Sequence, residues 1–179
     1  MDPVKILIDE HNLISRMRDV LEQELNRIEE HATVELNILN KAIDFVKTYA
    51  DKCHHGKEER YLFKQMKKKN LKKEDAEMLS QLEKEHIYER NLVTRLVNAG
   101  EEYFRGFTNE VDNVYECLEM LVNFFPVHIE HEEEDFFVRS MDYFSGEEKA
   151  DLVKKFYEHD RRLIHSKYRE ILEELEAKQ

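Results

Sequence analysis

The chain has 179 residues, of which 41% are hydrophobic and 38% charged, and its formal net charge is −12. With only four Gly and two Pro, this composition favours long amphipathic helices over a β-protein with many turns. The excess negative charge should repel nucleic acid and anionic membranes, so we expect neither as a partner. No apolar run reaches the roughly 20 residues of a membrane span, and the N-terminus lacks the apolar core of a signal peptide. We therefore expect a cytoplasmic protein.

Apolar residues recur at helical spacing along almost the whole chain. The pattern predicts five helices, at about residues 3–30, 33–69, 73–103, 108–141 and 145–177. Short connections between the first four predict an all-α fold, an antiparallel up-down four-helix bundle over about residues 3–141. The additional C-terminal helix should pack on the outside of the bundle or cover one end. We expect residues 1–179 to form a single domain.

Each of the first four predicted helices carries a histidine in phase with its apolar stripe, and the second and fourth add a glutamate four residues later. These six residues are His11, His54, Glu58, His86, His128 and Glu132. Residues at positions i and i+4 share one helix face, so one helix can offer an imidazole and a carboxylate to the same metal ion. Burying such groups without partners costs several kcal/mol each, and a metal ion removes that cost. Six ligands are too many for one tetrahedral zinc ion and suit two first-row metals bridged by carboxylates.

The helical phase also distinguishes between the two adjacent histidines of the second predicted helix. At 3.6 residues per turn, His54 falls near the apolar stripe, whereas His55 and Glu59 fall on the other side. We therefore predict that His55 and Glu59 lie at the flank of the helix or in solvent. The same reasoning places His131 of the fourth helix at the surface.

These motifs resemble the hemerythrin-like proteins, the HHE cation-binding group. The pattern HxxxEExxLF occurs at residues 54–63, and the related HIEHEEEDFF at residues 128–137. The pair Glu85-His86 matches the third-helix motif, and the stretch Asp9-Glu10-His11 matches the first-helix histidine. The four motifs occur in the correct order, so the resemblance covers about residues 3–141. It implies a non-haem di-iron site, two iron ions bridged by oxo, hydroxo or carboxylate groups, with the six residues above as ligands. Alignment on the second-helix motif also selects His54 over His55.

The sequence departs from the oxygen-carrying hemerythrins in its third helix. Those proteins use five histidines, two of them on this helix, and here only His86 is present. The resemblance is therefore closer to sensor, repair or storage relatives than to dedicated carriers. Glu89 lies one turn from His86 and is a possible additional metal ligand; alternatively it supports the ligands or pairs with Arg90.

We expect a binding protein that binds O2 reversibly, or senses O2 or nitric oxide, rather than an enzyme. The alternatives are iron storage, iron delivery to damaged iron–sulfur clusters, and turnover of peroxide or nitric oxide at the same metals. A fourth alternative is a structural bundle that binds no metal and whose histidines are only hydrogen-bonded. The sequence leaves the physiological metal, the oligomeric state and any signalling partner open.

Overall fold

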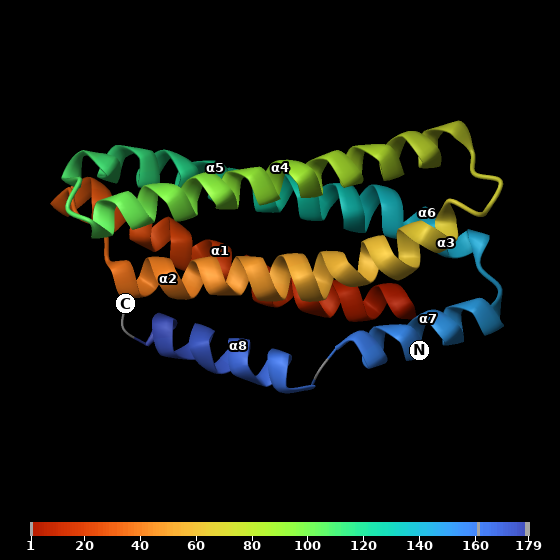
Figure 1. Ribbon diagram of the computed structural model, residues 1–179. Helices are drawn as coiled ribbons and strands as arrows, with labels where there is room; N and C mark the ends of the chain where they lie inside the picture. The colour runs from red at the N-terminus through yellow and green to blue at the C-terminus, as the bar shows by residue number, and fades with distance from the viewer. Residues whose placement is uncertain (1, 161, 178–179) are drawn as a thin grey trace.

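The computed structural model describes residues 2–160 and 162–177, and within these residues it contains helices and no strand. The predicted all-α bundle is confirmed. Four long helical runs lie side by side, and successive runs point in opposite directions (Figure 1). The first run is α1 (Pro3–His31) and the third is α4 (Lys73–Phe104). None of the helices in the described residues combines the length with the apolar character that a membrane span requires.

The second and fourth runs change helical type along their length. The second contains α2 (Leu36–Phe45), the π-helical segments η1 (Val46–His55) and η2 (Glu58–Phe63), and α3 (Lys64–Met66). The fourth contains η3 (Thr108–Glu110), α5 (Val111–Glu130), the π-helical η4 (His131–Phe137), α6 (Val138–Ser140) and η5 (Met141–Tyr143). A π-helix closes its hydrogen bonds from residue i to i+5, so its turns are wider than those of an α-helix.

The connection between the first two runs is longer than the sequence pattern predicts. The backbone of Ala32 adopts a left-handed conformation at φ 51° and ends α1. The next helix begins at Leu36, and its N-cap is Glu35, whose side chain accepts a hydrogen bond from the backbone N–H of Asn37. The helix therefore begins later than the predicted start at about residue 33, and the carbonyl oxygen of Thr33 accepts a hydrogen bond from Arg27 at 2.7 Å.

Two apolar clusters fill the interior of the bundle. One contains residues such as Met17, Phe45 and Leu118, and the other contains residues such as Leu7 and Phe63. Each cluster draws on several helical runs, with α5 packed against both α1 and α4. A group of buried polar side chains lies between the two clusters, so that apolar walls close it off along the bundle axis.

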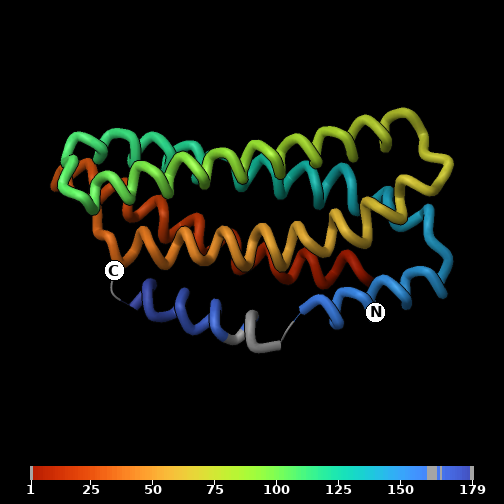
Figure 2. Tube along the Cα trace, viewed as in Figure 1, coloured from red at the N-terminus to blue at the C-terminus, as the bar shows by residue number. Residues whose placement is uncertain are grey.

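The predicted fifth helix is in fact two helices, α7 (Gly146–His159) and α8 (Arg162–Glu176). A capping box formed by Ser145 and Glu148 starts α7. Both helices lie on the outside of the bundle, where α7 and α8 contact α1 and α8 also contacts α2 (Figure 2). At the break between them, Asp160 has an extended backbone at ψ 104° and turns its side chain toward the bundle.

A buried lysine explains this break. Lys57, between η1 and η2, is 0% exposed and donates hydrogen bonds to Glu10 of α1 and, at 2.5 Å, to Asp160. His165 of α8 lies 3.1 Å from the other oxygen of Asp160. Burial by itself raises the pKa of Asp160, but His165 and Lys57 outweigh it and hold that pKa at about 2. We name Glu10, Lys57 and Asp160 the clasp.

We expect Asp160→Ala to lower the free energy of unfolding by about 2 kcal/mol, because the buried ammonium of Lys57 keeps only one carboxylate partner. Urea unfolding followed by circular dichroism measures this change. The control is Asp151→Ala, also on α7, which removes an exposed ion pair with Lys155 and should cost no more than about 0.5 kcal/mol. Equal losses in the two variants would contradict a stabilising role for the clasp.

Candidate metal centre

The structure brings all six predicted side chains together between the two apolar clusters. Each of them is at most 2% exposed. They come from all four helical runs: His11 from α1, His54 from η1, Glu58 from η2, His86 from α4, His128 from α5 and Glu132 from η4. Groups this polar are rarely buried together unless they satisfy one another or hold an ion.

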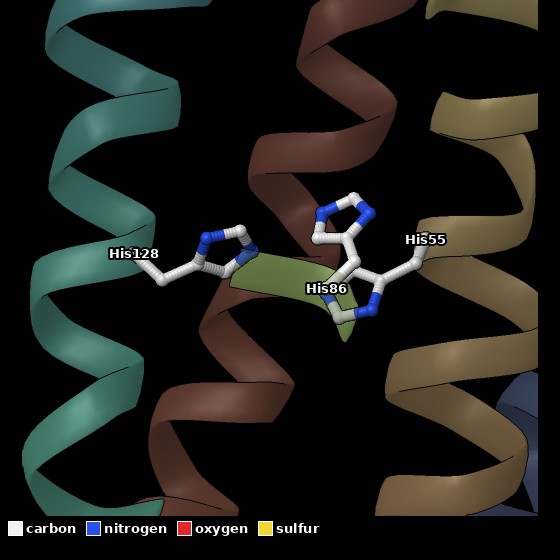
Figure 3. Close-up of side chains that lie close together, drawn as sticks. All are labelled: His55, His86 and His128. Carbon is white, nitrogen blue, oxygen red and sulfur yellow. The ribbon is translucent and has the colours of Figure 1, made fainter. Parts of the chain in front are cut away.

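The prediction that His55 lies at the flank or in solvent is wrong. His55 is 1% exposed, and its ring stacks on that of His86 with centroids 3.9 Å apart and an interplanar angle of 12°. The ring of His128 is nearly perpendicular to that of His55, with centroids 5.4 Å apart, and the three side chains point toward one another (Figure 3). These three histidines form one of the groups whose nitrogens lie close enough together to hold an ion.

The π-helical geometry of η1 is the reason for this difference. Because the turns of a π-helix are wider, two residues lie about one turn beyond a given residue on nearly the same face: the fourth and the fifth. Both His54 and His55 therefore follow Ala50 into the interior. Glu59, in contrast, is partly exposed at the flank, as predicted, and so is His131. The one sequence signal for His55 is the number of histidines: the oxygen carriers use five, whereas the helical phase selects only four here.

The carboxylate of Glu132 lies between two groups of histidines. Its Oε2 atom is 3.0 Å from Nε2 of His11 and 3.8 Å from Nε2 of His54. Its Oε1 atom is 3.4 Å from Nε2 of His128 and 3.5 Å from Nε2 of His86. One oxygen thus faces each group.

Glu58 repeats this arrangement from the opposite run. Its Oε1 atom lies 3.7 Å from Nε2 of His54, and its Oε2 atom lies 3.5 Å from Nε2 of His86. The site therefore has a two-histidine group, His11 and His54, and a three-histidine group, His55, His86 and His128. Two carboxylates connect the groups, which is the arrangement that bridging ligands of a metal pair require.

Carboxylates on the outer side orient the histidine rings. Four Nδ1 atoms each lie within hydrogen-bonding distance of one: His11 to Glu133 at 2.6 Å, His54 to Glu10 at 2.9 Å, His86 to Glu59 at 2.8 Å and His128 to Glu85 at 2.7 Å. A neutral imidazole that donates from Nδ1 keeps its lone pair on Nε2. The outer carboxylates therefore turn the lone pairs of these rings into the pocket, as they do around metal-ligating histidines in general.

Without a cation, protons balance the charge of the pocket. Burial and then the neighbouring Glu132 raise the pKa of Glu58 well above its ordinary value. Burial also acts to raise the pKa of Glu132, but His128 and hydrogen bonds from other histidines outweigh it and hold this pKa well below the ordinary value. Burial lowers the pKa of His11 and His86, yet hydrogen bonds to Glu132 outweigh it and raise both pKa values to about 9. A metal ion at Nε2 would take the place of these protons.

Several buried polar atoms here have no hydrogen-bond partner within the described residues. They include both carboxylate oxygens of Glu58 and Nε2 of His128, which face the pocket. Leaving such an atom unpaired costs about 1–3 kcal/mol. Metal ions between the two groups would satisfy these atoms, and the mixed imidazole and carboxylate donors are of the kind that first-row metals accept. The residues present therefore fit a bound metal.

Glu89, the possible additional ligand, lies outside the space between the two groups. It is 0% exposed, and its nearest histidine nitrogen is Nδ1 of His55, at 3.5 Å. The alternative pairing with Arg90 is wrong, because Arg90 instead contacts Asp51 and Glu59, each at 2.7 Å. Glu89 thus stands behind His55, but without the hydrogen bond that the outer carboxylates make to the other histidines.

Comparison with known proteins agrees with this geometry. The family model described as the hemerythrin HHE cation binding domain matches residues 2–140. This range contains both histidine groups and both connecting carboxylates, whereas α7 and α8 lie beyond it. Neither a curated protein nor a solved structure matches the chain.

We expect His54→Ala and His55→Ala each to reduce the metal content of the iron-loaded protein to about half, because each removes one ligand from a different group. Elemental analysis after anaerobic loading and desalting measures the content. His31→Ala, which removes an exposed histidine, is the control and should retain all of it. Full metal content in His55→Ala would instead support the regular helical wheel, in which only His54 faces the metal.

Proposed function

Because the chain belongs to the hemerythrin HHE cation-binding domain family, we propose that it holds two iron ions and binds or senses O2 or another diatomic molecule such as nitric oxide. One observation carries this proposal. Glu58 and Glu132 each direct one oxygen to the two-histidine group and the other to the three-histidine group. Two carboxylates shared in this way support a pair of metals rather than a single ion.

The donors divide unequally between the two positions. Imidazoles of His11 and His54 would hold one ion, and those of His55, His86 and His128 the other, with Glu58 and Glu132 shared. Iron held by these residues would supply accessible redox states, and the two-histidine position would have the room for a diatomic ligand. The smaller number of imidazoles at that position supports it as the place where the external molecule binds.

Aromatic rings keep the pocket rigid and dry. Phe137 stacks on His11 with centroids 5.9 Å apart, Phe63 on His86 at 5.6 Å, and Phe124 on His128 at 5.0 Å. Phe63 and Phe137 also belong to the apolar cluster next to the site. Apolar walls exclude water, which would otherwise compete for the open coordination place. The enclosed pocket also limits the site to a fixed small number of ions, which favours ligand binding over bulk iron storage.

The test is anaerobic loading of the metal-free protein with Fe2+, followed by exposure to O2. We expect about two iron ions per chain and a new visible absorption band that disappears when O2 is removed. The loaded protein should also be more stable, by about 2.7 kcal/mol for each bound ion when free Fe2+ is 100 times its dissociation constant. Glu132→Ala, which lacks one shared carboxylate, should lose both the second ion and the band.

Other results separate the competing functions. Less than one iron per chain would exclude a metal pair. Two bound ions without any spectral response to O2 or nitric oxide would leave a metal-binding protein but overturn the diatomic ligand. Transfer of the iron to a cluster-free iron–sulfur protein would favour iron delivery, and multiple turnovers of added peroxide would favour an enzyme.

A further inference from the structure

A cavity of about 210 Å³ lies between η1 and α4, next to the metal pocket. Its walls include the apolar side chains of Val46, Val93 and Val97, and its rim includes Lys47 and Lys52. Glu89 also lines this cavity, although its side chain is completely buried. The cavity thus borders the residue whose carboxylate stands directly behind His55.

Glu89 is a buried carboxylate without a hydrogen-bond partner among the described residues, and this holds for both of its oxygens. Nδ1 of His55 also lacks a partner there. Together with Asp51, these two residues offer three ligand atoms that all lie within 4.8 Å of one another. Carboxylate oxygens and an imidazole nitrogen are ligands for divalent first-row metal ions. A cation at this point would satisfy atoms that the fold otherwise leaves unpaired.

We propose that Asp51, His55 and Glu89 form a loading site, which binds a divalent metal ion on its way from the cavity to the metal pair. This inference rests on the proposed function, because it assumes that ions must reach the enclosed pocket. The net charge of −12 attracts cations to the protein as a whole. The exposed lysines at the rim carry charges that solvent and salt screen, and Arg90 is already neutralised by Asp51 and Glu59.

The chemistry of His55 makes the loading site a temporary one. A neutral imidazole has a single lone pair, on one nitrogen or the other. Nδ1 of His55 lies next to Glu89, so Nε2 is the nitrogen left to bind an ion in the three-histidine group. It can therefore serve the loading site or the inner position, but not both while it keeps its proton. An ion at the loading site precedes the completed pair and is released from His55 when the inner position fills.

A residue on the path of an ion has a kinetic signature that a ligand does not share. It changes the rates of uptake and release by the same factor, so the equilibrium dissociation constant stays unchanged. A metal ligand, or a residue that only orients His55, stabilises the bound state and therefore changes the release rate and the dissociation constant. Measuring both rates and the equilibrium distinguishes these roles for Glu89.

The experiment uses Co2+ as the probe and the full-length metal-free chain. Stopped-flow absorption measures uptake, dilution into excess chelator measures release, and competition with a chelator of known affinity gives the dissociation constant. We expect Glu89→Gln to slow both uptake and release about tenfold, with an unchanged dissociation constant. Glu101→Gln, the same substitution at an exposed position of α4, is the matched control and should leave both rates unchanged.

A second variant keeps the test valid if Glu89→Gln fails to fold. Thr94→Phe places a large ring at an exposed residue that lines the cavity and contacts no metal ligand, and it should also slow both rates. Unchanged rates, or faster release with weaker binding in Glu89→Gln, would overturn the loading site. If either result is found while the wild-type protein binds about two Co2+ ions, only the loading site is overturned and the proposed metal pair stands. A wild-type protein that binds fewer would overturn the proposed function and, with it, this inference.

Discussion

The structure depends on the burial of two carboxylates, Glu58 and Glu132, among five imidazoles. Neither carboxylate is exposed to water, and their charge must be balanced inside the bundle. In the metal-free chain protons do this, since hydrogen bonds to Glu132 raise the pKa values of His11 and His86 to about 9. Metal ions would do it with stronger and more directional bonds, and this is why four helices converge on the site.

The layers around this centre hold it in place by different means. Outer carboxylates fix the ring orientations, and phenyl rings stack on three of the imidazoles. The clasp adds a connection to the C-terminal helices. Glu10 accepts a hydrogen bond from His54 and also from Lys57, which in turn contacts Asp160 between α7 and α8. Elements beyond the matched residues 2–140 thus reach to within two side chains of a proposed ligand.

In the part of the chain that the structure describes, each of the three π-helical segments carries at least one residue of the site. His54 and His55 lie in η1, Glu58 begins η2, and Glu132 lies in η4. Widened helical turns are frequent at functional sites. Here the widening has a definite result: it turns two adjacent histidines into one pocket, where a regular α-helix would direct only one of them inward. The fifth imidazole of the site is therefore a product of helix type and not of sequence spacing alone.

The sequence by itself determined the four helical runs and the six residues His11, His54, Glu58, His86, His128 and Glu132 that converge between them. The helical spacing of these residues is a local property of each segment. Each helix needs this spacing to bury its apolar stripe, regardless of which helix packs against it. Only the tertiary structure decided the position of His55, the break at Asp160 and the place of Glu89. Each depends on contacts between distant segments: packing that favours a π-helix, a lysine that draws in a carboxylate 103 positions away, and a cavity between two runs. A helical wheel describes one regular helix and contains none of these interactions.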